Sequence, residues 1–257
     1  MSGRTFRTAW ITGASTGIGA ELAKHLAADG CRVAVSARNA DRLRQMAETA
    51  GSERILPVAV DVTDPAGVAA GYSSVLEAFA AAPDLVVLNA GFFEPMGAKD
   101  FTADLFRRHI EVNLMGVAQV LDAVLPDMLK RGSGHIAIVG SVSGYRGLPK
   151  AVAYGATKAA LINMAESLRV ELAPKNIVIQ IVNPGFVDTP MTRDNAFPMP
   201  HLMPVDKAAR AFMRGLRSSR FEITFPKRFT WKLKLLRILP YRIYFPLIRR
   251  ATRSTGS

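Results

Sequence analysis

The amino-acid sequence predicts an α/β protein with a doubly wound parallel sheet. Short apolar runs rich in β-branched residues recur along the chain, and stretches with helical periodicity separate them. Near-continuous apolar strands that alternate with helices are typical of a parallel sheet covered on both faces. The chain has 257 residues, 49% of them hydrophobic, which is enough to build one large core.

Each expected strand is short and is followed by a helical stretch. In order, the strands cover residues 8–11, 32–36, 55–60, 85–88, 135–139 and 177–182, and a last one ends near Phe225. The sequence contains no internal repeat, low-complexity tract or linker, so we expect a single domain over residues 1–226. Residues 227–257 differ in composition and form a basic, aromatic-rich C-terminal extension.

Three glycines lie in the turn after the first expected strand. Gly13, Gly17 and Gly19 have the spacing G-x-x-x-G-x-G, and a helical apolar pattern follows them. Glycines permit a tight turn, and their missing side chains let the backbone approach a pyrophosphate. The next helix directs its free N–H groups toward such an anion. The turn therefore predicts a dinucleotide site, and the alternative is a plain strand-to-helix turn.

Tyr154 and Lys158 are four residues apart in a stretch with helical character. At this spacing a phenol and an ammonium group lie side by side on one helical face. A free phenol has a pKa near ~10, and a fixed cation beside it lowers that pKa. A drop of roughly three pKa units needs about 4 kcal/mol, which a dry cleft with a second positive charge can supply. The pair is a candidate acid–base centre or, alternatively, the polar edge of an amphipathic helix.

Further motifs agree with these two in order and spacing. They are LNAG at residues 88–91, EVNLMG around Asn113, Ser141 thirteen residues before Tyr154, and NPGFVDT at residues 183–189. Together with TGASTGIG at the glycine turn, they make the chain resemble the short-chain dehydrogenase/reductase family over about residues 5–225. Leu88 replaces the first Asn of the family's Asn-Asn-Ala-Gly segment.

The resemblance implies a Rossmann-type sheet of seven strands in the order 3-2-1-4-5-6-7, and it assigns roles to the motifs. The implied catalytic residues are Asn113, Ser141, Tyr154 and Lys158. The implied cofactor-binding residues are Gly13, Ser15, Thr16, Gly17, Ile18, Gly19, Asp61, Val62, Asn89, Ala90, Gly91, Tyr154, Lys158, Pro184, Gly185, Val187 and Thr189. No metal is implied.

The same resemblance implies a mechanism. Tyr154 exchanges a proton with the substrate oxygen while a hydride passes to or from the nicotinamide. Lys158 lowers the pKa of Tyr154 and binds the nicotinamide ribose, and Ser141 orients the substrate oxygen. Asn113 holds a water that links Lys158 to solvent. His109 and His135 fall outside the motifs, and we expect both to be structural or to lie on the surface.

The end of the second expected strand bears on the choice of cofactor. Ala37 stands where an enzyme specific for NAD usually places an Asp, and Arg38 follows it. A guanidinium can bind a 2′-phosphate as a fork, whereas a carboxylate would repel it. We therefore expect NADP(H) to be preferred and bound by Arg38, with Asn39 and Arg42 as helpers. NAD(H) stays an option, because Thr16 is neutral where many NADP enzymes of the family carry a second basic residue.

The segment after Thr189 is rich in Pro and Met and occupies the place of the family's substrate lid. One apolar wall of the pocket would come from Met191, Phe197, Met199, Leu202 and Met203, and the facing wall from Phe92, Phe93 and Met96. Such a pocket suits a lipophilic ketone or alcohol, such as a fatty acyl chain, a sterol or an isoprenoid. The alternative is a lid whose apolar side chains pack on the core.

The C-terminal region carries most of the net charge. Residues 217–257 contain eleven Lys or Arg and one acid, and so hold +10 of the formal +12. Aromatic and aliphatic residues are mixed with these charges, as in segments attracted to anionic bilayers. Pro240 and Pro246 split this apolar and basic segment. It contains no uninterrupted apolar stretch of the ~20 residues that a membrane-spanning helix needs, so we expect that it does not cross a membrane. The aliphatic content argues against nucleic acid, and packing on the chain's own cleft or on a dimer mate is the alternative.

The resemblance also bears on assembly. Family members commonly pair through helices that correspond here to residues 100–130 and 152–173, and the extension would crowd a second interface, so we expect a homodimer. The single Cys31 excludes an intramolecular disulfide, and residues 1–8 are too polar for a signal peptide. We therefore expect a cytoplasmic protein, with peripheral membrane contact as an option.

Two classes of function follow from these observations. The first is an active NADP(H)-dependent oxidoreductase that acts on a hydrophobic carbonyl or alcohol. The second is a catalytically silent dinucleotide-binding module that docks to membranes or partners through the basic extension. The intact set of Asn113, Ser141, Tyr154 and Lys158 favours the first class, because a module freed from catalysis need not keep all four.

Overall fold

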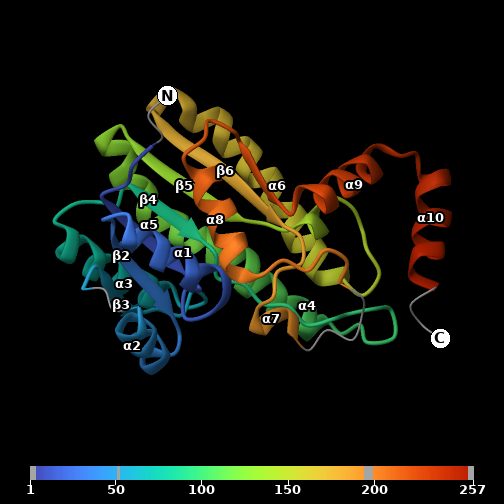
Figure 1. Cartoon of the computed structure of the whole chain (residues 1–257), viewed down its shortest axis with the longest axis horizontal. Coiled ribbons are helices and arrows are strands. Elements are labelled where there is room, and N and C mark those ends of the chain that lie inside the picture. Colours follow the sequence, from blue (N-terminus) through green and yellow to red (C-terminus); the bar gives the residue numbers. More distant parts are fainter. Residues whose placement is uncertain (1–3, 51–52, 194–198, 254–257) are drawn as a thin grey trace.

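A seven-stranded parallel sheet forms the centre of the computed structural model, which describes residues 4–50, 53–193 and 199–253 (Figure 1). Its strands are β1 (Thr8–Thr12), β2 (Arg32–Ala37), β3 (Ile55–Ala59), β4 (Leu85–Leu88), β5 (Gly134–Val139), β6 (Ile177–Pro184) and β7 (Glu222–Phe225). The strand order is β3-β2-β1-β4-β5-β6-β7, and all neighbours are parallel. The predicted fold class and strand order are confirmed.

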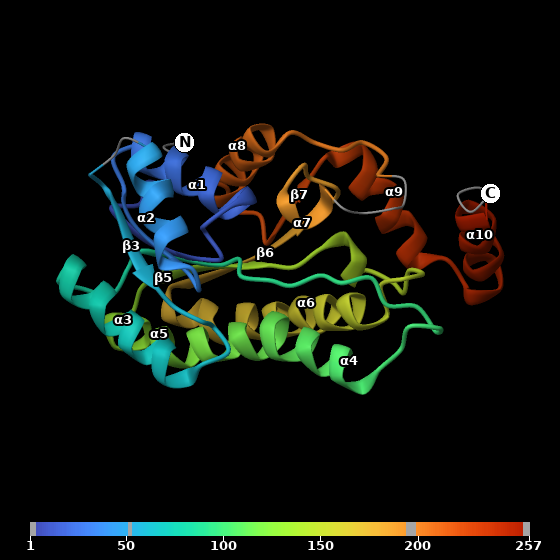
Figure 2. The same ribbon diagram turned by 90° about the horizontal axis from the view of Figure 1, so that it is seen from below.

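Helices cover both faces of the sheet (Figure 2). One face carries α1 (Gly17–Ala28), α2 (Ala40–Thr49) and α8 (Val205–Leu216), and the other carries α3 (Pro65–Phe79), α5 (Gly116–Arg131) and α6 (Val152–Leu172). Two apolar cores lie between these helices and the sheet. Leu22, Leu43 and Phe212 belong to the first core, and Val75, Val120 and Leu161 belong to the second.

One long helical stretch contains a change of hydrogen-bond register. α4 (Ala103–Ile110) continues into a π-helical turn, η1 (Glu111–Met115), and then into α5. In the part of the chain that the structure describes, Ala103–Arg131 is the one helix with the length and composition to cross a membrane. Val120, Val124 and Met128 of this stretch are completely buried against the sheet, as in the core helix of a globular domain.

Most of the remaining elements lie near the carboxyl ends of the strands. They are the 3-10 turn η2 (Val142–Gly144), the short helix α7 (Pro190–Arg193), and the C-terminal helices α9 (Lys227–Ile238) and α10 (Tyr241–Arg253). A second 3-10 turn, η3 (Ala173–Lys175), lies at the opposite end of the sheet and leads from α6 into β6. α10 stands at the end of the molecule, away from the sheet, in both views (Figures 1 and 2). Pro240 separates the two helices as expected, but Pro246 lies inside α10. The helix continues there because a proline removes one backbone hydrogen bond but keeps a helical φ angle.

Candidate active site

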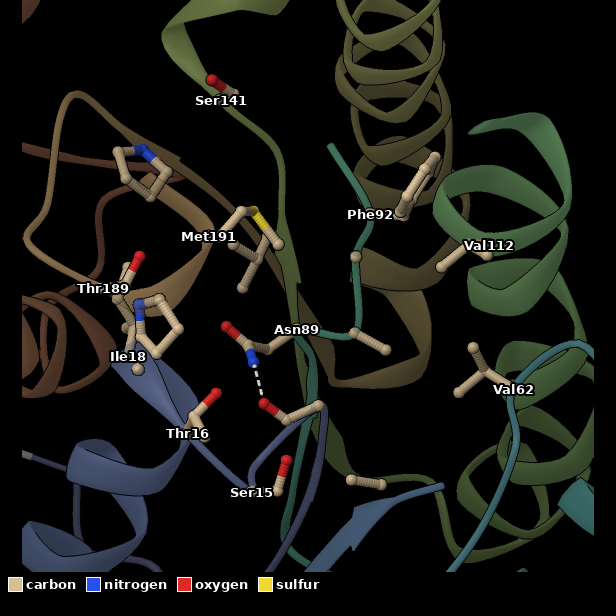
Figure 3. Close-up of a pocket in the computed structure, with 18 of the residues that line it drawn as sticks. Ser15, Thr16, Ile18, Val62, Asn89, Phe92, Val112, Ser141, Thr189 and Met191 are labelled. Atoms are coloured by element: carbon tan, nitrogen blue, oxygen red, sulfur yellow. Dashed lines mark hydrogen bonds between the residues drawn. The ribbon is translucent and has the colours of Figure 1, made fainter. Parts of the chain in front are cut away.

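The turn between β1 and α1 is shaped by its glycines. Gly13 and Gly17 have φ angles of +66° and +62°, in the left-handed region that favours glycine. A Cβ on Gly13 would lie 2.6 Å from the Cα of Ala90, and a Cβ on Gly19 would lie 2.6 Å from Nδ2 of Asn89. Asn89 Nδ2 donates to the carbonyl oxygens of Thr12 at 3.1 Å and Gly13 at 2.8 Å, and Figure 3 marks one of these bonds. The end of β4 therefore holds the turn closed.

The start of α1 lacks a side-chain cap. Thr16 occupies the N-cap position, and its side chain makes no capping hydrogen bond. The first N–H groups of a helix have no partner within the helix, and they carry its positive dipole end. This turn therefore fits a dinucleotide, since it combines a close backbone approach with free donors for a pyrophosphate.

A pocket of about 410 Å³ opens over this turn and over the carboxyl ends of the strands (Figure 3). Most residues expected from the sequence line it: Gly13, Ser15, Thr16, Gly17, Ile18, Arg38, Asp61, Val62, Asn89, Ala90, Gly91, Ser141, Tyr154, Lys158, Pro184, Gly185, Val187 and Thr189. Gly19 and Asn113 are not among the lining residues, because Gly19 is buried behind the turn and Asn113 is completely buried. The fold thus brings together motifs that are far apart in the sequence.

Asn113 ties the segment after β4 to α6. Its Oδ1 accepts from the backbone N–H of Phe92 at 2.7 Å, and its Nδ2 donates to the carbonyl of Phe92 at 2.9 Å and to Thr157 Oγ1 at 3.2 Å. Asn113 lies on the π-helical turn, a feature often found at functional sites. A Cβ on Gly91 would lie 3.5 Å from Asn113 Oδ1 and 3.8 Å from Lys158 Nζ, so both polar groups border one space.

Tyr154 and Lys158 lie one turn apart on α6, as their spacing predicts. The Lys158 ammonium is 5.6 Å from the centre of the Tyr154 ring and donates to the carbonyl of Val139 at 2.8 Å. Lys158 is 3% exposed, and this burial lowers its pKa to about 8. The phenol and the ammonium therefore share one poorly hydrated region of the pocket.

The pKa of Tyr154 differs from the sequence-based expectation. Burial raises the pKa of the phenol above its ordinary value, and a hydrogen bond with Ser141 lowers it only in part. The expected lowering by Lys158 does not dominate, because the ammonium is bonded to Val139 and the phenol loses its hydration. The Phe93 and Tyr154 rings pack in a T-shaped arrangement with their centres 4.9 Å apart, which adds to that loss.

The end of β2 supplies positive charge to the pocket. Arg38 and Arg42 both line it, and no carboxylate among the described residues forms an ion pair with either guanidinium. Asn39, expected as a helper, accepts a hydrogen bond from the backbone N–H of Arg42 at 2.8 Å and caps α2. Asp61 Oδ1 accepts from the backbone and hydroxyl of Thr63, at 2.9 and 2.8 Å. The two arginines are therefore available to an anionic ligand.

The expected substrate walls are only partly present. Met191, 45% exposed, and Phe92 line the pocket, and Met191 projects into its middle (Figure 3). Met203 packs against the core beside Val187, which is the alternative considered for the lid. Met96 was expected in the facing wall, but it is 1% exposed and does not line the pocket. Its backbone N–H donates to the carbonyl of Lys150, and its backbone pairs with Ala151, which holds it inside the protein. Phe197 lies outside the described residues.

Sequence reasoning missed several lining residues. Three of them are Arg108, Val112 and Thr192, which line the pocket but were given no role from the sequence. Arg108 lies 4.1 Å from the centre of the Phe92 ring, and Thr192 Oγ1 donates to the carbonyl of Val187 at 2.6 Å. Val112 lies inside the EVNLMG motif but was given no role there, and no motif includes Arg108 or Thr192.

His109 and His135, which were expected to be structural or to lie on the surface, are both buried, at 0% and 3% exposure. His109 Nε2 accepts from the backbone N–H of Glu94, and Nδ1 lies 2.9 Å from the carbonyl of Leu105. His135 Nε2 lies 2.7 Å from the side-chain oxygen of Gln180. Neither histidine lines the pocket.

Comparisons with known proteins agree with this geometry. A family model described as "short chain dehydrogenase" matches residues 7–197. An uncharacterized oxidoreductase of Myxococcus xanthus is 36% identical over 252 residues, which cover 97% of this chain and 99% of that protein. A short-chain type dehydrogenase/reductase from Mycobacterium marinum has a similar structure, with a TM-score of 0.77, 27% identity, and coverage of 85% of this chain and 93% of that chain. A 3-ketoacyl-(acyl-carrier-protein) reductase from Brucella melitensis, complexed with NADH, has a TM-score of 0.77, 26% identity, and coverage of 85% and 96%.

Proposed function

The chain belongs to the short-chain dehydrogenase/reductase family and is an oxidoreductase, and on that premise we propose that it interconverts a carbonyl and an alcohol on a hydrophobic substrate. We further propose NADP(H) as the preferred cofactor. The observation that carries the proposal is the convergence of Ser141, Tyr154 and Lys158 on the pocket that also contains the glycine turn. A reacting carbon placed there would meet both a proton donor and the cofactor site.

In the proposed mechanism, bound NADP(H) supplies or accepts a hydride at the carbon that bears the oxygen. Tyr154 gives its proton to the carbonyl oxygen in reduction and takes one from the alcohol in oxidation. Ser141 donates a hydrogen bond to the same oxygen and fixes its position. Lys158, buried one helical turn away, favours the phenolate form of Tyr154.

Asn113 has a supporting role in this proposal. Its amide fixes the backbone of Phe92, and its Oδ1 keeps a second lone pair beyond the bond to the Phe92 N–H. The space beside Gly91 borders both this oxygen and Lys158 Nζ. A water in that space would pass protons between Lys158 and solvent.

The preference for NADP(H) rests on charge. Arg38 and Arg42 line the adenosine end of the pocket without a carboxylate partner in the described part of the chain, and Ala37 leaves no acid to repel a 2′-phosphate. A guanidinium binds phosphate as a fork. The Brucella melitensis reductase is complexed with NADH, so the affinity of this protein for NADH and for NADPH should both be measured.

The proposal of a hydrophobic substrate rests on the side chains around Tyr154. Phe92, Val112 and Met191 line the pocket, and Phe93 packs on the Tyr154 ring. A lipid-like, sterol-like or isoprenoid-like ketone or alcohol would bury its apolar surface against them. A small polar substrate would leave that surface uncovered.

We also propose a homodimer and a cytoplasmic location. Met115, Leu129, Val152 and Val170, on η1, α5 and α6, are exposed apolar residues on the helices expected to pair. Cys31 is a buried thiol whose pKa is raised to about 12 by burial, so it suits a packing role in a reducing compartment. Peripheral contact with an anionic membrane through residues 227–257 is part of this proposal, and the basic composition of that segment supports it.

The second candidate is a silent dinucleotide-binding module that docks through its basic extension. A direct test follows the fluorescence of NADPH on binding and then its oxidation with a panel of hydrophobic ketones and aldehydes. We expect binding followed by oxidation with at least one class of carbonyl. Binding without oxidation of any panel member would favour the silent module.

A further inference from the structure

The C-terminal helices are anchored to the two segments that border the active site. Phe229 of α9 packs on the segment after β6, with its ring centre 5.3 Å from that of Phe186. A Cβ on Gly185 would lie 2.7 Å from Cδ1 of Phe229, so the ring lies directly against the Gly185 backbone. Thr230 is completely buried, and Lys234 pairs with Glu222 at the start of β7. One side of α9 is therefore fixed to the body of the enzyme.

Arg146 anchors the junction of α9 and α10. Its guanidinium donates to the carbonyls of Leu236 at 2.8 Å and Leu239 at 2.5 Å, at the end of α9, and the Leu236 carbonyl also accepts the backbone N–H of Leu239. The same group lies over the rings of Tyr241 and Tyr244, 4.6 and 4.0 Å from their centres. Because Arg146 lies between Ser141 and Tyr154 in the sequence, these contacts set the orientation of the extension relative to the active site.

The opposite side of α9 carries an exposed apolar stripe. Trp231, Leu235 and Ile238 are 63%, 58% and 76% exposed, and their spacing of four and three residues places them on one face. Lys227, Arg228 and Lys232 are exposed on the same side of the helix and border the stripe. We call these six residues the α9 face. An exposed tryptophan among aliphatic and basic residues is typical of a helix that lies in a membrane interface.

The charge of the extension decides among possible partners. Residues 227–257 contain nine Lys or Arg and no Asp or Glu. A second copy would bring two strongly positive surfaces together, and like charges oppose that contact. Nucleic acid would pair with the basic side chains that border the stripe (Lys227, Arg228 and Lys232, the basic rim) but would leave the stripe itself without an apolar partner. An anionic lipid surface satisfies both the charged rim and the apolar stripe.

We propose that the α9 face is the surface through which the enzyme docks on an anionic phospholipid bilayer, with the stripe inserted at the level of the headgroups. This inference rests on the peripheral membrane contact proposed above, and it names the residues that make the contact. The anchoring by Arg146 and Phe229 keeps the docked face beside the segments that border the pocket, so a lipophilic substrate has a short path from bilayer to Tyr154.

The test is flotation of the full-length protein with vesicles of phosphatidylcholine alone or mixed with phosphatidylglycerol. Wild type should float with the mixed vesicles at low salt, and should float much less at high salt or with phosphatidylcholine alone. The variant W231Q/L235Q/I238Q keeps good helix formers and the net charge, and it should lose most of the bound fraction.

A charge-matched pair of variants isolates the rim. K227Q/R228Q/K232Q should bind mixed vesicles roughly fivefold more weakly for each charge removed, whereas K175Q/K207Q/R214Q, with the same change in net charge elsewhere on the surface, should bind like wild type. NADPH binding is measured on every variant. It shows whether the variant is folded and whether the proposed cofactor site works, and neither result depends on flotation. Failure of wild type to float would overturn the membrane contact, and equal flotation of wild type and W231Q/L235Q/I238Q would overturn the α9 face.

Discussion

The guanidinium of Arg146 lies 4.0 Å from the centre of the Tyr244 ring, and the Tyr244 hydroxyl donates to the carbonyl of Gly147 at 2.5 Å. Tyr244 is 2% exposed, although most of α10 faces solvent. The loop between Ser141 and Tyr154 is thus held from outside by the C-terminal helices. Support for the active site extends beyond the region that the family motifs cover.

Arg146→Ala should release this support. The variant loses hydrogen bonds from a charged donor and two cation–π contacts, and we expect a loss of about 2 kcal/mol in the free energy that holds α9 and α10 in place. Hydrogen exchange of the α9 and α10 amides should become faster, and the KM for the carbonyl substrate should rise while the Kd for NADPH stays nearly constant. Arg146→Lys is the control and should restore only part of the protection, since an ammonium cannot reach several carbonyls as a fork. Unchanged exchange in Arg146→Ala would contradict the role of Arg146.

The choice of cofactor should depend on Arg38. Arg38→Ala removes a charge-assisted bond to the 2′-phosphate, so the KM for NADPH should rise by about tenfold or more while the KM for NADH changes little. Ala37→Asp should act in the same direction, because a carboxylate at the end of β2 repels the phosphate and can bind the ribose hydroxyls. Steady-state kinetics with both cofactors checks this. A wild type that uses NADH at least as well as NADPH would show that the role given to Arg38 is wrong.

Acid should destabilise the protein through His135. The pKa of this imidazole is lowered from 6.5 to about 4, mainly by burial and also by the charges of Arg4 and Arg169, and the hydrogen bond with Gln180 opposes the shift. Between these two pH values the unfolded chain binds a proton that the folded chain does not, so the stability is complete above 6.5 and falls as the pH drops toward 4. The loss at the acid end should approach about 3 kcal/mol.

Urea unfolding over this pH range measures the effect. His135→Gln is the control, because its side chain can still pair with Gln180 but does not titrate. The free energy of unfolding of the variant should depend less on pH between 6.5 and 4 than that of wild type. Parallel curves for the two proteins would assign the acid sensitivity to other groups.

Much of the fold followed from local patterns. The apolar runs at residues 32–36 and 85–88 coincide with β2 and β4 to within one residue, because a strand buried on both faces leaves a continuous apolar record in the sequence. The order of the strands required the family resemblance, since periodicity carries no information on which strands are neighbours. Pro246 was expected to split the C-terminal apolar run, and the structure continues α10 through it.

The site was less accessible to sequence reasoning where it depends on packing. The π-helical turn at Glu111–Met115 differs from an α-helix by one step in the hydrogen-bond ladder, which leaves no periodic signal, and it decides how Asn113 and Val112 are directed. The raised pKa of Tyr154 reflects burial by residues such as Phe93 that are distant in sequence. The anchoring by Arg146 joins two regions of the chain about ninety residues apart, and no motif records it.

Catalysis in the proposed mechanism depends on Tyr154 as the proton donor and acceptor. The most direct measurement is the rate of NADPH oxidation with hydrophobic ketones and aldehydes by wild type and by Tyr154→Phe, with thermal unfolding and NADPH binding measured alongside. We expect a fall in turnover of roughly 10²–10⁴-fold with little change in stability or NADPH affinity, because the ring remains and only the hydroxyl is lost. Retention of more than about a tenth of the wild-type rate by Tyr154→Phe would contradict this role of Tyr154.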